Sequence, residues 1–127
     1  MSSASRFPDF LHDVGHPLVY WPRMADVFGG VNAVILMSQL YYWNDKGHDP
    51  DGWVYKTAEE LLHETGLTEK QQRLARNILK DLGVLAERPD RLHHRLYFRL
   101  NLDKIGDLWD SKANAELTKG NFAGAPK

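Results

Sequence analysis

The side chains best suited to chemistry in this 127-residue chain are arginines and lysines, which gather in one part of the sequence. Residues 66–99 contain eight basic and four acidic residues, although the formal net charge of the whole chain is −1. Guanidinium and ammonium groups bind phosphates, and arginine and asparagine also bind base edges in a major groove. Because binding to nucleic acid depends on local contacts, a near-neutral chain with such a segment can still present a DNA-facing surface.

Most of these cations fall on one face of a predicted helix. At 100° per residue, the apolar side of this helix carries Ala75, Ile78, Leu79 and Leu82. The opposite side carries Glu69, Lys70, Arg73, Arg76, Asn77 and Lys80. We expect Arg73, Arg76 and Asn77 to read bases, and Lys70 and Lys80 to hold phosphates. A charged face that only meets solvent, as on most amphipathic helices, is the alternative interpretation.

A second basic group belongs to a predicted β-hairpin. Its strands are Val84–Arg88 and Leu92–Leu100, joined by a turn at Pro89, Asp90 and Arg91. Alternation in the second strand separates Leu92, His94, Leu96, Phe98 and Leu100 from His93, Arg95, Tyr97 and Arg99. We expect Arg88, Arg91 and Arg95 to contact phosphates beside the helix. Charges that protect an exposed strand edge from aggregation are the alternative.

Local sequence signals define the elements that position these residues. Thr57 and Thr68 each begin a helix, and the first has the capping-box pattern T-A-E-E. Gly66 and Gly83 end the two helices. The other predicted elements are a helix over Val31–Trp43, a loop over Asp45–Gly52, a strand over Trp53–Lys56 and a closing helix over Leu102–Trp109. This order predicts a mainly α domain with a small antiparallel β-sheet, arranged as a winged helix-turn-helix.

The run GWVYKTAEELLHETGLTEKQQRLARNILKDLGVL, followed by RLYFRLN, resembles winged helix-turn-helix domains of phage and plasmid replication and regulatory proteins. The upstream run FGGVNAVILMSQLYYW is also similar to the segment that precedes the wing domain in such proteins. The resemblance implies a recognition helix over residues 68–82 and a wing over residues 88–95. It implies binding to double-stranded DNA in replication or transcription regulation. The chain ends soon after the wing, which favours plain DNA binding, or binding to another protein, over helicase loading.

Protein partners are the main competing interpretation. The net charge and the acidic first half of the chain favour a phage-encoded interaction module that inhibits or adapts a host complex. The nearly all-round apolarity of Val31–Trp43 also predicts a homodimer formed through this helix. Five nearby aromatic residues could form a stacking platform for single strands, but their acidic neighbours favour core and dimer-interface roles. These aromatic residues are Tyr41, Tyr42, Trp43, Trp53 and Tyr55.

No motif in the sequence indicates an enzyme active site or a metal-binding site. The absence of cysteine excludes disulfides and thiolate metal sites, and neither the histidines nor the aspartates of the loop have ligand spacing. There is no glycine-rich phosphate loop, so we expect no catalytic residue, metal or cofactor. Without a signal-peptide pattern or an apolar run long enough to span a bilayer, we expect a cytoplasmic, nucleoid-associated protein. The expected organisation is a leader over 1–15, one domain over 16–110 and a tail over 111–127.

Overall fold

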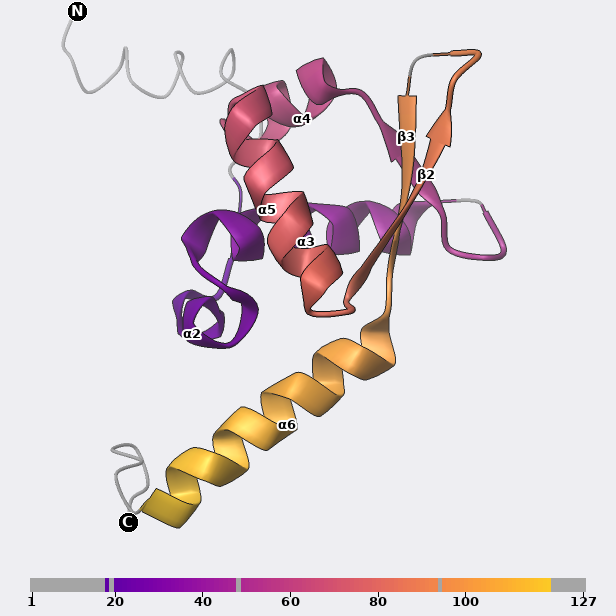
Figure 1. The fold of residues 1–127 in the computed structure, drawn as a ribbon. Coiled ribbons are helices and arrows are strands. Elements are labelled where there is room, and N and C mark those ends of the chain that lie inside the picture. Colours follow the sequence, from indigo (N-terminus) through magenta and orange to yellow (C-terminus); the bar gives the residue numbers. More distant parts are fainter. Residues whose placement is uncertain (1–17, 19, 48, 94, 120–127) are drawn as a thin grey trace, which may run out of the picture.

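The structure, a computed structural model, describes residues 18, 20–47, 49–93 and 95–119 (Figure 1). The expected leader over 1–15 lies outside the described residues. The fold is mainly helical with one three-stranded antiparallel sheet, as the sequence predicts. Its elements are the 3-10 helix η1 (Pro22–Met24), α2 (Ala25–Phe28), α3 (Val31–Lys46), β1 (Val54–Lys56), α4 (Ala58–Thr65), α5 (Glu69–Asp81), β2 (Leu85–Asp90), β3 (Arg95–Leu100) and α6 (Leu102–Lys119).

Helix α3 is the centre of the packing. Val34, Leu36 and Leu40 on this helix are all at most 1% exposed. α3 contacts α2, α4, α5 and the sheet, and this coverage on several sides explains why its sequence is apolar almost all round. The expected helix over Val31–Trp43 is therefore confirmed, but the apolarity from which we predicted a homodimer is accounted for inside the chain. Tyr41 and Tyr42 near its C-terminal end remain 48% exposed, so they are not core residues.

The sheet has the strand order β1-β3-β2, with β3 paired to both neighbours. Phe98 of β3 is 1% exposed and faces the helices. Strand β2 continues through Pro89 and Asp90, so the turn lies at residues 91–93 rather than at Pro89–Arg91 as predicted. Proline is tolerated here because β2 is an edge strand, which does not need every N–H for pairing.

The turn of the hairpin is held by Asp90. Its Oδ1 accepts a hydrogen bond from the His93 backbone N–H over 3.3 Å, and its Oδ2 lies 2.9 Å from His93 Nδ1. β3 consequently begins at Arg95, and Leu92 is an 82%-exposed turn residue instead of a member of the apolar strand face. The prediction for Leu92 was wrong, whereas those for Phe98 and Leu100 are confirmed.

A close helix contact depends on Gly29, which follows α2. Its φ is +92°, and a Cβ at this position would lie 2.3 Å from Cγ2 of Ile78 in α5. Only glycine meets both conditions, a left-handed backbone and no space for a side chain. Gly29 thus lets the α2–α3 connection pack directly against α5.

Helix α6 extends further than the sequence indicates. It continues to Lys119 instead of ending at Trp109, and it leads away from the sheet (Figure 1). Asn101 caps its start, because its Oδ1 accepts a hydrogen bond from the Lys104 N–H over 3.0 Å. None of the helices in the described part of the chain has the length and apolarity needed to cross a membrane.

Candidate nucleic-acid interface

Helices α4 and α5 form a tight helix-turn-helix. Both begin with complete capping boxes, formed by Thr57 with Glu60 and by Thr68 with Gln71. In the first box Thr57 Oγ1 accepts from the Glu60 N–H over 3.0 Å, and Glu60 Oε1 accepts from the Thr57 N–H over 2.8 Å. Gly66 ends α4 with a φ of 79°, a left-handed conformation that reverses the chain after the helix.

Gln72 locks this turn, a role that was not predicted from the sequence. Its side chain is fully buried, and its Nε2 donates to the carbonyl oxygens of Ala58 and Leu67, each over 2.9 Å. Both carbonyls belong to the α4–turn segment, so one amide fixes α5 against it. Its spacing of three residues from Ala75 and seven from Leu79 places it beside the apolar side of the helix, but glutamine is mostly an exposed residue, so its residue type gave no reason to expect burial.

Three of the predicted DNA-contacting residues are exposed together on α5. Lys70, Arg73 and Asn77 recur at intervals of three and four residues, so they share one side of the helix. Within the described residues, neither Lys70 nor Arg73 forms an ion pair with a carboxylate. Their charges therefore remain available to a ligand.

Two other predicted residues are neutralised inside the molecule. Arg76 Nε lies 2.7 Å from Oε2 of Glu87 in β2, and Lys80 Nζ lies 3.1 Å from its Oε1. The Arg76 side chain is 17% exposed and that of Glu87 is 14% exposed, so their pair is largely removed from water. Arg76 thus joins α5 to the hairpin and does not extend outward as a base-reading side chain would.

The three hairpin arginines that were expected to contact phosphates also have different surroundings. Arg91 is exposed at the turn, where it and residues of α5 line the same cavity. Arg88 lies on the other face of β2, where its guanidinium carbon stands 4.7 Å from the ring centroid of Tyr97. Arg95 is the first residue of β3 and stands opposite Asp90 in the strand register, and its side chain lies outside the described part of the structure.

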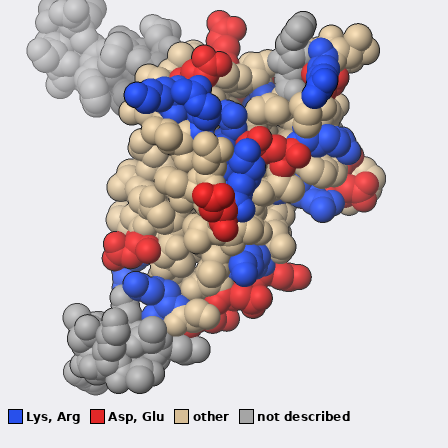
Figure 2. All heavy atoms as spheres, in the orientation of Figure 1, with Lys and Arg blue, Asp and Glu red and all other residues tan. Residues whose placement is uncertain are grey.

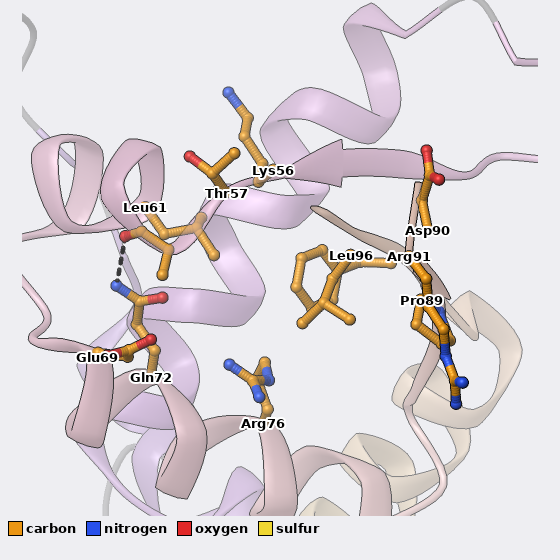
Figure 3. A pocket seen from close by; sticks show the side chains of 12 residues that line it. Lys56, Thr57, Leu61, Glu69, Gln72, Arg76, Pro89, Asp90, Arg91 and Leu96 are labelled. Carbon is orange, nitrogen blue, oxygen red and sulfur yellow. Dashed lines mark hydrogen bonds between the residues drawn. The ribbon is translucent and has the colours of Figure 1, made fainter. Parts of the chain in front are cut away.

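A cavity of about 570 Å³ separates α5 from the hairpin. Figure 3 shows Arg76 directed from α5 toward this space, with Gln72 on one side and Pro89 and Arg91 on the other. Among the described residues, the Oε1 of Gln72 has no hydrogen-bond partner. Apolar side chains of Leu61, Leu96 and Phe98 complete the wall.

The charged surface is divided. Figure 2 shows basic side chains over the upper part of α5 and over the hairpin, with acidic and uncharged atoms between them. Part of the interruption comes from Glu87, which lies between Arg76 and Lys80. The described basic side chains of α5 and the hairpin therefore do not form one continuous cationic band on this face.

A partly buried polar cluster supports the first helix of the helix-turn-helix. Glu64 of α4 accepts hydrogen bonds from Lys56 over 2.6 Å, Gln39 over 2.8 Å and Trp43 over 2.9 Å. The Lys56 Nζ also lies 3.7 Å from the Trp43 ring centroid. Burial alone raises the pKa of Glu64, but these hydrogen bonds and the charge of Lys56 outweigh it, so the pKa is lowered. The cluster joins α3, β1 and α4.

The described residues thus define a small mainly helical domain with a helix-turn-helix and an antiparallel hairpin. No group of three histidine or acidic residues within this part of the chain could hold a metal ion. No protein family, curated protein or solved structure matches the chain.

Proposed function

We propose that the chain is a winged helix-turn-helix protein that binds double-stranded DNA through α5 and the β2–β3 hairpin. The observation that carries the proposal is the exposed set Lys70, Arg73 and Asn77 on the second helix of a helix-turn-helix, without intramolecular carboxylate partners in the described residues. These are side chains that bind phosphates and base edges.

The roles proposed for individual residues follow their surroundings. Arg73 and Asn77 are the proposed base-reading residues, and Lys70 and Arg91 are the proposed phosphate ligands. Arg76 and Lys80 hold the hairpin against α5 through Glu87, so they set the distance between the two DNA-binding elements. Regulation of replication or transcription in the cytoplasm is the setting that this proposal favours.

The test is a fluorescence-anisotropy titration of random-sequence duplex DNA at several salt concentrations. Replacing Lys70 and Arg73 by alanine is expected to remove two cationic contacts and to weaken binding about tenfold or more. The salt slope of log K should also become shallower by about 0.9, because Lys70 is the proposed phosphate ligand of the two and each phosphate contact adds about 0.9. Lys104→Ala with Lys112→Ala on α6 is the charge-matched control. Equal losses in both double variants, or no binding by the wild type at low salt, contradict the proposal.

A protein-interaction module is the second candidate, favoured by exposed apolar side chains on the same two helices. Leu74 of α5 is 52% exposed and Leu62 of α4 is 46% exposed. Large leucines in contact with water are typical of surfaces that bind other proteins when they cluster. Failure to bind duplex DNA, together with a lower tendency of Leu74→Ser to co-purify with host proteins, would favour this candidate.

A further inference from the structure

The face of the sheet opposite the helices carries an ordered array of aromatic rings and guanidinium groups. We call it the outer sheet face, and its residues are Trp53, Tyr55, Arg88, Tyr97 and Arg99. Strand pairing places Tyr55, Tyr97 and Arg88 in one row across β1, β3 and β2. Side chains alternate along a strand, so the apolar Phe98 points to the other face, where α3 and α5 contact the sheet.

The two arginines of this face lie over aromatic rings. The Arg88 guanidinium carbon is 4.6 Å from the Trp53 ring centroid and 4.7 Å from that of Tyr97. The Arg99 guanidinium carbon is 4.9 Å from the Trp53 ring centroid. Tyr55 and Tyr97 meet edge to face, with centroids 5.5 Å apart, and Tyr55 is 48% exposed.

Both guanidinium groups keep an uncompensated charge. Among the described residues, neither Arg88 nor Arg99 forms an ion pair with a carboxylate, in contrast to Arg76, which is bound to Glu87. A guanidinium group that lies over a ring is held in place, and its N–H donors lie in its own plane and can bind a further group. Such a group is pre-organised to bind a phosphate in a bidentate manner.

We propose that the outer sheet face binds single-stranded DNA, with Arg88 and Arg99 on phosphates and an unpaired base stacked on Tyr55. Rings exposed on a sheet stack on bases, and cations beside them follow the backbone, which is the general chemistry of single-strand binding. Duplex DNA does not satisfy this face, because its bases are already stacked on each other. The choice of DNA over RNA rests on the proposed function, because a chain that binds duplex DNA on α5 would then also bind single-stranded DNA on its sheet.

One carboxylate of the acidic loop before β1 is held by hydrogen bonds within the loop. Asp49 is turned toward its own loop, where its Oδ2 accepts hydrogen bonds from the backbone N–H groups of Asp51 and Trp53 over 3.1 and 3.0 Å. The acidic residues of this loop predict core or dimer-interface roles for Trp53 and Tyr55. The structure instead groups them with Tyr97, which is distant in sequence and was not considered with them.

The test uses the full-length protein and a fluorescently labelled oligothymidylate of about twelve nucleotides, within the usual site size. Tyr55→Thr keeps a strand-favouring residue and is expected to weaken binding about tenfold, the loss of one stacked base. Tyr41→Ala is its control, because Tyr41 is also 48% exposed but lies on α3. Arg88→Lys with Arg99→Lys keeps the charge, removes the stacked planar group and should also weaken binding about tenfold. Thermal melting by circular dichroism verifies that each variant is folded.

Each result separates the two surfaces. Loss of oligothymidylate binding in the Tyr55 and arginine variants, with duplex binding within about twofold of wild type, supports the inference. The Lys70→Ala and Arg73→Ala double variant should show the opposite pattern. If the wild type does not bind oligothymidylate, prefers the matching RNA, or loses binding equally on Tyr41→Ala, the inference is wrong. If duplex DNA does not bind at all, the proposed function fails, and the oligothymidylate titrations of the Tyr55, arginine and Tyr41 variants still test the outer sheet face by themselves.

Discussion

Replacement of Glu87 by glutamine tests how the charges of α5 are controlled. This carboxylate forms both ion pairs that neutralise Arg76 and Lys80, over 2.7 and 3.1 Å. Glutamine has nearly the same size and can still accept a hydrogen bond, but it carries no charge. The substitution therefore leaves two cations uncompensated next to the proposed DNA-binding side of α5.

The expected gain can be worked out from these two ion pairs. If both released cations contact phosphates, log K should fall more steeply with log salt by about 1.8, since each contact adds about 0.9. Between about 50 mM and about 200 mM salt, the affinity advantage of the variant over wild type should then shrink about tenfold. The same change should lower the free energy of unfolding by about 1–3 kcal/mol, because Arg76 loses its partner in a largely buried position.

The assay combines anisotropy titrations of duplex DNA over a salt series with chemical denaturation. Asp107→Asn on α6 is the control, because it makes the same change in net charge at an exposed position without an ion pair among the described residues. Equal affinity gains in the two variants would show that only net charge matters. A Glu87→Gln protein with unchanged affinity and unchanged salt slope would refute the reasoning.

Two further predictions concern stability. Glu64→Gln should lower the free energy of unfolding by about 1–3 kcal/mol at neutral pH, because Lys56 loses its charged partner. The pKa of Glu64 is lowered in the folded state, so the stabilisation by its carboxylate is complete above the ordinary value of 4.5 and is lost as the pH falls through the folded pKa. Urea titrations from neutral to acidic pH measure this loss. Gly29→Ala should cost about 2–4 kcal/mol, measured by thermal melting, because it adds both left-handed strain and a clash with Ile78.

Matched variants distinguish these effects from general damage. Glu59→Gln changes an exposed carboxylate on the same helix as Glu64, so it should leave stability and its pH dependence nearly unchanged. Gly66→Ala adds left-handed strain at a φ of 79° without any contact within 4 Å, so it should cost only about 1–2 kcal/mol. A Gly29→Ala loss no larger than that of Gly66→Ala would contradict the close-packing argument.

Local signals allowed much of the fold to be predicted from the sequence. The two helices of the helix-turn-helix begin at Thr57 and Thr68 because each capping box is complete within four residues. The hairpin turn was misplaced because Pro89 is usually a turn residue, and its tolerance on β2 depends on this strand being at the sheet edge. That position follows from the packing of the whole sheet and not from the local sequence.

The candidate site was harder to predict because its electrostatics are tertiary. Arg73 and Arg76 lie about one helical turn apart on the charged side of α5, yet of these two only Arg76 meets Glu87, which is brought to it by the path of β2. Arg88 was expected on a phosphate beside α5 but stacks on Trp53 across the sheet. Which cations are neutralised, stacked or available depends on contacts between elements, and the sequence pattern does not record them.

The edges of the sheet have a consequence for self-association. β1 is only three residues long, and β2 contains Pro89, which has no N–H to offer. Within the described residues, these two edges offer a second copy only short rows of unpaired backbone groups for pairing between molecules. Assembly of this domain has to depend on side-chain contacts, such as those of Tyr41 and Tyr42 at the exposed end of α3, and should respond to point substitutions there.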